Sequence, residues 1–278
     1  MEEHRVLEGK AGVRQVYDEM ADLYDSSEHL YWTRRMEEGE ERAIRKWVEM
    51  AQSPLIDVGC GTGRYALKKA IEGSEVIALD ISLEMIRRTV EKARKYGCDL
   101  NIHPILADGE NLPFRERSFN SLICTLTFDH FERCELAASE FSRVLKDGGL
   151  CILTTFNPYT LNDWKRRAGV PLDKIRFQTE KMPPTLVYEV GHSANEIKEL
   201  FKKHGFEVIG VRGCCYWHLL PLSLIKCYKL ELDSFFNSLR FLMRYAELHS
   251  VCMKKSKHAH ASFQQRINRL LKLLKSKI

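Results

Sequence analysis

Short apolar runs alternate with amphipathic stretches along most of the chain, and this alternation predicts an α/β fold. Between the runs, apolar residues recur at helical spacing, and strands that alternate with helices favour a parallel sheet covered on both faces. Residues 11–50 are expected to be helical, with a break near Ser26 and Ser27, and to cover that sheet. The expected strands lie at 54–58, 75–80, 100–106, 121–128, 150–156, 206–212 and 249–254.

The first expected strand leads into a glycine-rich turn. The run Leu55-Ile56-Asp57-Val58-Gly59-Cys60-Gly61-Thr62-Gly63-Arg64 predicts a buried strand, a tight turn and the start of a helix. Glycine accepts positive φ and lets a ligand approach the backbone, and a helix N-terminus offers free N–H groups. A dinucleotide-binding turn needs a small residue where Arg64 stands. The turn therefore indicates a nucleoside-like ligand without a pyrophosphate, and the Asp57 carboxylate suits a cationic one.

Two more carboxylates follow the next two expected strands. Asp80 comes 23 residues after Asp57, the position from which an acidic side chain accepts both ribose hydroxyls. Asp108 follows the third strand, where it is expected to accept a hydrogen bond from the exocyclic amine of adenine. Ser82 is a candidate helix N-cap. Met85 points back toward this crevice, where it packs on adenine or belongs to the ordinary core.

These segments together resemble the signatures of a known family. The glycine turn resembles motif I, acidic-x-G-x-G-x-G, of the class I S-adenosylmethionine-dependent methyltransferases. The run 107–114 with the following Ser-Phe-Asn, and the run 140–149 with Asp147 in place of the common Pro, resemble later signatures of that family. The resemblance spans roughly 10–255. Within the family, the chain is similar to the ubiquinone/menaquinone-methyltransferase-like "methyltransferase type 11" group of small-molecule enzymes.

The resemblance implies a Rossmann-like sheet of seven strands. Its last strand, 249–254, is expected to insert antiparallel between the fifth and sixth strands. The expected division is an N-terminal helical cap at 1–50, a methyltransferase domain at 51–256 and a basic amphipathic helix at 257–278. Within the domain, 157–192 is expected to be an irregular insertion that forms a lid over the substrate, with a disordered surface loop as the alternative.

The resemblance also implies S-adenosyl-L-methionine as cofactor. The Y-D-x-M-A-x-x-Y-D pattern near the N-terminus resembles a cap from which Tyr17 or Tyr24 closes over the ligand. His130, after the fourth strand, is the expected catalytic residue; it acts as a general base, orients the substrate or only caps the next helix. The expected cofactor-binding residues are Tyr24, Asp57, Gly59, Cys60, Gly61, Gly63, Asp80, Ile81, Met85, Ala107, Asp108, Gly109 and Leu126.

Composition narrows the remaining choices. No apolar run approaches the ~18 residues of a membrane span, and the polar segment 1–5 lacks a signal peptide's apolar core, so a cytoplasmic protein is expected. The nine cysteines include no C-x-x-C pair, so no metal site is expected. The net charge is +5, but 254–278 carries eight Lys or Arg and no acid. The rest of the chain is therefore slightly acidic and does not resemble a general nucleic-acid surface.

The sequence leaves three functions open. The first is in-line methyl transfer from S-adenosyl-L-methionine to a small-molecule or lipid-like acceptor. The second is methylation of RNA, such as tRNA, or of protein, with the basic tail at 258–278 as the handle. The third is a non-catalytic S-adenosylmethionine-binding subunit. The tail itself suits a membrane surface, a partner, RNA or this protein's own body.

Overall fold

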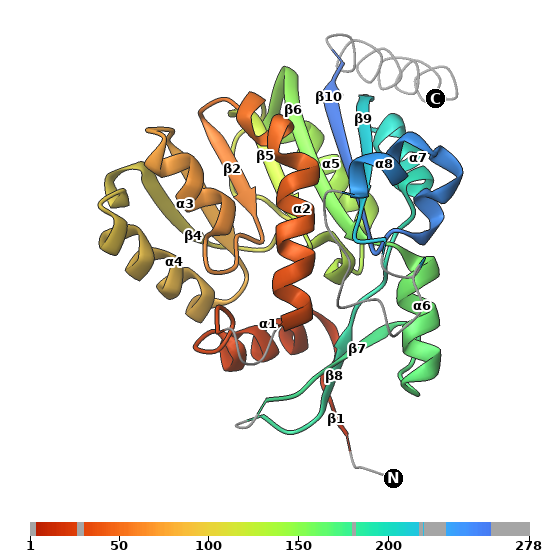
Figure 1. The fold of residues 1–278 in the computed structure, drawn as a ribbon. Helices are drawn as coiled ribbons and strands as arrows, with labels where there is room; N and C mark the ends of the chain where they lie inside the picture. The colour runs from red at the N-terminus through yellow and green to blue at the C-terminus, as the bar shows by residue number, and fades with distance from the viewer. Residues whose placement is uncertain (1–3, 27–30, 180–181, 217–218, 220–231, 257–278) are drawn as a thin grey trace, which may run out of the picture.

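The chain folds around one seven-stranded sheet. This computed structural model describes residues 4–26, 31–179, 182–216, 219 and 232–256. The strand order is β4-β3-β2-β5-β6-β10-β9 (Figure 1). The strands are β2 (Leu55–Val58), β3 (Val76–Asp80), β4 (Ile102–Leu106), β5 (Phe119–Thr125), β6 (Leu145–Phe156), β9 (Phe206–Cys214) and β10 (Leu248–Lys255). β10 runs antiparallel to both β6 and β9, which confirms the expected insertion of the last strand between the fifth and sixth.

Helices cover both faces of the sheet, which explains why its central strands β2 and β5 are buried on both sides. α2, α3 and α4 pack on one face, where Ile44, Leu55 and Ile123 share a core cluster. α5 and α7 pack on the other face with Ile56 and Phe141. The helices are α1 (Gly9–Met20), α2 (Tyr31–Met50), α3 (Arg64–Ile71), α4 (Leu83–Tyr96), α5 (Cys134–Val144), α6 (Pro158–Arg167), α7 (Ala194–Lys203) and α8 (Leu232–Ser238), with 3-10 turns η1 (Asp99–Asn101), η2 (Phe128–His130) and η5 (Arg240–Tyr245).

Local signals set several helix ends where the sequence predicts them. The Ser82 hydroxyl accepts the Met85 N–H at 3.2 Å and caps α4. Ser193 and Glu196 form a reciprocal capping box at the start of α7. The fourth strand, in contrast, ends earlier than expected, because Leu126 takes a φ of +52° and the chain turns into η2.

The segment 157–192 is not irregular, so that prediction is wrong. It contains α6, β7 (Lys174–Phe177) and β8 (Thr185–Tyr188), and β8 pairs in parallel with β1 (Arg5–Val6). The three strands form a second sheet in the order β1-β8-β7, which lies beside α1 (Figure 1). Neither β1 nor β8 is long enough to stand alone, so this sheet forms only when two distant segments of the chain meet.

α1 and this small sheet form one unit, which we call the roof. The α1 side chains Val13, Val16 and Met20 share a buried apolar cluster with Met182 and Val187 from the insertion. Within the part of the chain that the structure describes, no helix is both long and apolar enough to cross a bilayer. The basic tail at 257–278 lies outside the described residues.

Candidate active site

A cavity of about 280 Å³ opens at the carboxyl edge of β2, β3, β4 and β5, beneath α1. It takes residues from the glycine turn, from the ends of β3 and β4, and from α1. The expected cofactor residues that line it are Tyr24, Asp57, Gly59, Cys60, Gly61, Asp80, Ile81, Ala107, Asp108, Gly109 and Leu126. The fold therefore brings these predicted residues together around one cavity, which Tyr17 and His130 also line.

Gly63 and Met85 are outside the cavity lining. Gly63 is the N-cap of α3 with a φ of +88°, and a Cβ there would come within 3.0 Å of Thr89. Met85 is 1% exposed and belongs to the core, which is the second of the two roles expected for it from the sequence. Both residues serve packing beside the cavity.

Asp80 joins the glycine turn to the next helix. Its Oδ2 accepts the Gly61 N–H at 2.8 Å, and its Oδ1 accepts the Ser82 N–H at 2.9 Å. Burial raises the pKa of the Asp80 carboxyl, while these backbone N–H groups favour its ionised form. The carboxylate is thus fixed in orientation at the mouth of the turn.

Asp57 lies deeper, under the same turn. It is 2% exposed, and its Oδ2 accepts the Ala66 N–H at 3.0 Å in the first turn of α3. Burial raises the pKa of Asp57 to about 7. Asp57 therefore holds the helix start in place as well as lining the cavity.

Asp108 is paired with a residue that the sequence analysis missed. Lys10 of α1 donates to Asp108 Oδ2 at 2.5 Å and lies 2.8 Å from Glu110 Oε2. The burial of Lys10 lowers its pKa, but these two carboxylates outweigh that and raise it overall. No local pattern marks Lys10, because its partners lie about a hundred residues further along the chain.

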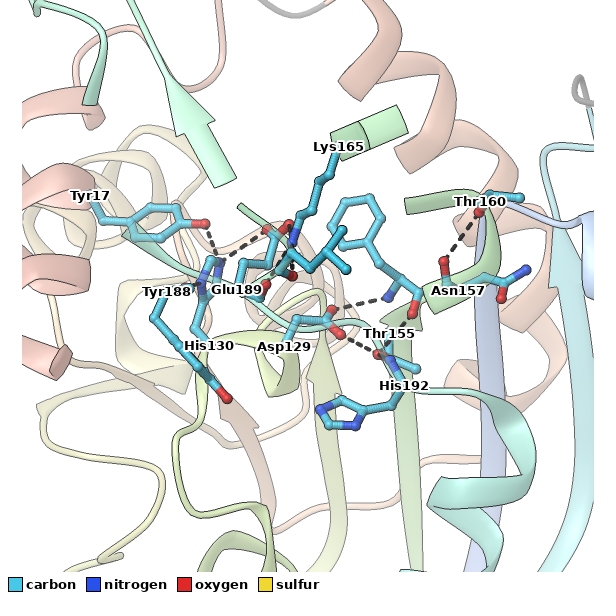
Figure 2. A network of polar contacts seen from close by, with 12 residues as sticks. Tyr17, Asp129, His130, Thr155, Asn157, Thr160, Lys165, Tyr188, Glu189 and His192 are labelled. Carbon is cyan, nitrogen blue, oxygen red and sulfur yellow. Dashed lines mark hydrogen bonds and ion pairs between the residues drawn. The ribbon is translucent and has the colours of Figure 1, made fainter. Parts of the chain in front are cut away.

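His130 and Tyr17 meet in the cavity lining. The Nδ1 of His130 lies 2.8 Å from the Tyr188 carbonyl oxygen, which only accepts, so Nδ1 carries the proton. In the neutral ring Nε2 is then an acceptor, and the Tyr17 hydroxyl donates to it at 2.8 Å (Figure 2). Burial raises the pKa of Tyr17 well above its usual range, which keeps the phenol protonated. Since Arg133 is the N-cap of α5, His130 does not cap that helix.

A buried polar network lies behind His130. It contains Glu189, Lys165 and Asp129, all of which the sequence analysis missed (Figure 2). Asp129 accepts the Phe156 N–H at 3.1 Å and a hydrogen bond from the Thr155 hydroxyl. The lining residues of the cavity include none from 157–192 in the described chain, so this insertion reaches the site through α1 and His130 rather than as a direct lid.

Comparison with known proteins agrees with this arrangement. A methyltransferase domain family matches residues 56–153. The uncharacterized protein MJ1252 of Methanocaldococcus jannaschii is 31% identical over 73% of this chain and 80% of its own length. A malonyl-[acyl-carrier protein] O-methyltransferase of Methylovorus is 32% identical over 55% of this chain, and a demethylmenaquinone methyltransferase of Porphyromonas gingivalis is 29% identical over 55%. The matches span 53% and 64% of those two relatives.

Solved structures show the same fold. The magnesium protoporphyrin IX methyltransferase of Synechocystis, solved with bound SAH, matches 89% of this chain and 99% of its own with a TM-score of 0.61 at 15% identity. A methyltransferase of Thermotoga maritima matches 87% of this chain and 99% of its own with a TM-score of 0.59 at 19% identity. The domain match, the relatives named as methyltransferases and the inserted antiparallel strand agree, and the chain belongs to the class I S-adenosylmethionine-dependent methyltransferases.

Proposed function

We propose that this chain transfers the methyl group of S-adenosylmethionine to a small-molecule acceptor within the cavity. The observation that carries the proposal is the convergence of the glycine turn, Asp80, Asp108 and His130 on that one cavity. Because α1 covers the cavity and the small sheet backs α1, an acceptor has to fit beneath the roof. A small molecule, or a flexible chain that carries one, suits such a site better than folded RNA or protein.

The residues present suit an adenosine. The Asp80 oxygens accept the Gly61 and Ser82 N–H groups and also interact with the Ile81 N–H, and the carboxylate keeps acceptor capacity for a ribose hydroxyl. Among the described residues, an added Cβ at Gly61 would find only the Tyr24 ring, 4.0 Å away. The backbone there faces open space, so a ligand has room to lie directly against it.

The chain's own contribution is positioning and proton handling. When bound, S-adenosylmethionine supplies a methyl group on a positively charged sulfur, already activated for in-line displacement. The roof excludes water, and the fixed turn and carboxylates orient the reactants; such positioning supplies on the order of 7–11 kcal/mol of barrier reduction. On the acceptor side, His130 Nε2 and the Tyr17 hydroxyl are the groups that hold or move a proton.

Two named relatives supply the first acceptors to try. A coupled assay for S-adenosylhomocysteine release tests demethylmenaquinone, malonyl-[acyl-carrier protein], the small-molecule fraction of a cell extract, and tRNA. Turnover that requires a small acceptor supports the proposal. Turnover with tRNA or protein alone would contradict it, and donor binding without any turnover would favour a non-catalytic subunit. The variant Asp80→Asn, assayed beside the parent, shows whether any release depends on this cavity.

A further inference from the structure

A carboxylate and an ammonium lie buried behind His130, and the reaction as described so far uses neither. Glu189, directly after β8, is 3% exposed, and Lys165, on α6, is fully buried. Lys165 Nζ donates to the Glu189 carbonyl at 2.6 Å and to the Leu172 carbonyl at 3.2 Å. A buried ion pair of this kind is weak evidence for stability, because desolvation offsets the attraction between the charges. A contribution to stability alone therefore does not explain why these two charged residues are buried beside His130.

The Glu189 carboxylate is only loosely held. Its Oε1 lies 3.9 Å from Lys165 Nζ and has no hydrogen-bond partner among the described residues. Its Oε2 lies 3.8 Å from His130 Nε2 (Figure 2). Burial raises the pKa of Glu189, whereas His130 and Lys165 oppose that rise. A carboxylate in this position gains stability when a positive charge appears on the neighbouring imidazole.

The geometry also fixes where a proton would be added. Since Nδ1 already donates to the Tyr188 carbonyl, a further proton enters at Nε2, the nitrogen nearest Glu189. Tyr17 donates to this nitrogen, and Asp129 and Lys165 are the charged groups that interact with Glu189 behind it. Burial raises the pKa values of Tyr17 and Asp129 well above their usual ranges and lowers that of Lys165. Of the residues that the structure describes, Glu189 is the one whose carboxylate forms an ion-pair contact with Nε2, at 3.8 Å.

We propose that Glu189, anchored by Lys165 through its backbone carbonyl, is a positioning residue that prepares His130 to take up the proton that the acceptor loses. The acceptor then belongs to the class whose nucleophilic atom still bears a proton near pH 7, a hydroxyl or an acidic C–H, rather than a free carboxylate. The acceptor atom bonds to the methyl carbon, whose bond to sulfur breaks with the electron pair staying on sulfur. The displaced proton passes to the Tyr17 hydroxyl, and the hydroxyl's own proton moves along its hydrogen bond to His130 Nε2. This inference rests on the proposed methyl transfer.

Nuclear magnetic resonance on protein with isotope-labelled histidine tests the coupling without any acceptor. The protein is saturated with S-adenosylhomocysteine, and the His130 ring signals are followed against pH in the parent and in Glu189→Gln. The variant is expected to shift the His130 titration midpoint to lower pH by about one unit, because an opposite charge within ~4–6 Å favours the charged form. The exposed Glu199→Gln on α7 is the matched control and is expected to leave the midpoint in place.

Further variants keep the inference falsifiable. If Glu189→Gln does not fold, Glu189→Asp is measured instead, because the shorter side chain moves the negative charge away from Nε2, and the His130 midpoint is expected to fall by a smaller amount. A midpoint that stays within 0.2 units in the folded variant overturns the inference, whatever the enzyme methylates. With an acceptor in hand, the lower limb of the pH profile of kcat/KM is expected to move with the same variants. A carboxylate acceptor overturns the inferred substrate class. Methylation of tRNA alone overturns the proposed function, but the effect of Glu189 on His130 is still decided separately by the NMR titration.

Discussion

Asp57 and Asp80, at the ends of neighbouring strands, perform different tasks although the sequence presents them alike. Asp57 is turned inward and holds the first turn of α3 through Ala66, whereas Asp80 joins the glycine turn to Ser82 at the cavity edge. The two carboxylates also differ in what they leave free. The Asp80 side chain retains acceptor capacity where a ribose is expected, and the Asp57 side chain stays almost wholly within the protein.

Asp57→Asn is expected to flatten the pH dependence of stability. Folding raises the pKa of Asp57 from an ordinary 3.8 to about 7, so the folded state holds this proton more tightly than the unfolded state. This contribution is fully present below about pH 4 and is lost as the pH rises to about 7. At ~1.36 kcal/mol per unit, the loss is on the order of 4 kcal/mol. Urea unfolding of the ligand-free protein between pH 4 and 7 measures it; a slope equal to that of the parent would contradict the assignment.

Asp80→Asn is expected to weaken binding of S-adenosylhomocysteine by more than tenfold. The variant keeps one side-chain oxygen but loses the negative charge, and hydrogen bonds to charged groups contribute ~1.5–3 kcal/mol. Calorimetry at pH 7.5 gives the affinity, with the exposed Asp99→Asn as the control. Equal affinities of the parent and Asp80→Asn would remove this carboxylate from the donor site.

The site residues that the sequence predicts are marked by local spacing, whereas those that it misses depend on partners far away in the chain. The glycine turn and Asp80 are marked by spacing within one strand–turn–helix unit, so a local pattern is enough to place them. Glu189, Lys165 and Lys10 become meaningful only through their partners, which lie on other elements. No local regularity distinguishes such a buried charge from an exposed one.

Among the elements, α7 and β8 mark the two extremes of predictability. α7 carries its start signal in its own sequence, the capping box of Ser193 and Glu196. β8 has four residues and follows two prolines, and its partners β1 and β7 complete its hydrogen bonding. Its strand character is therefore a property of the folded chain, which explains why 157–192 looks irregular in the sequence.

Ser193→Ala is expected to lower the free energy of unfolding by about 1 kcal/mol, the usual contribution of a helix N-cap. The Ser193 hydroxyl accepts the Glu196 N–H at 3.2 Å, and the alanine leaves that donor to water. Affinity for S-adenosylhomocysteine is expected to stay the same, because α7 contributes nothing to the cavity lining within the described chain. Urea unfolding and calorimetry on one preparation separate the two effects; a weaker affinity would show that α7 influences the site.

At the scale of the whole molecule, the roof and the sheet have separate cores. The roof's apolar cluster includes Val16 and Val187, which are fully buried, and the cavity lies between this cluster and the main sheet. β1 fastens the roof through the Arg5 and Leu7 N–H groups, which donate to Pro184 and Leu186 at 2.9 Å. The closure of the site therefore depends on a short segment remote from the chemistry.

Removal of residues 1–7 is expected to loosen the roof without unfolding the sheet. Without β1, the Pro184 and Leu186 carbonyls lose their donors and β8 becomes an edge strand that opens more often, so amide hydrogens in 185–188 should exchange at least tenfold faster. S-adenosylhomocysteine should also dissociate faster. Hydrogen exchange by mass spectrometry and stopped-flow release measure the two effects. Removal of 258–278 serves as the comparison and is expected to leave donor affinity intact; unchanged exchange after the N-terminal truncation would contradict the role given to β1.

The pairing of β1 with β8 also has a consequence for how the protein is made. Arg5 and its partner Thr185 are 180 residues apart, so β1 emerges from the ribosome long before the strand that receives it. The glycine turn and the first three βα units can assemble in that interval, since their contacts are mostly local. Completion of the pocket therefore belongs to a late step of biosynthesis, and a nascent chain halted before β8 would carry a binding turn without its cover.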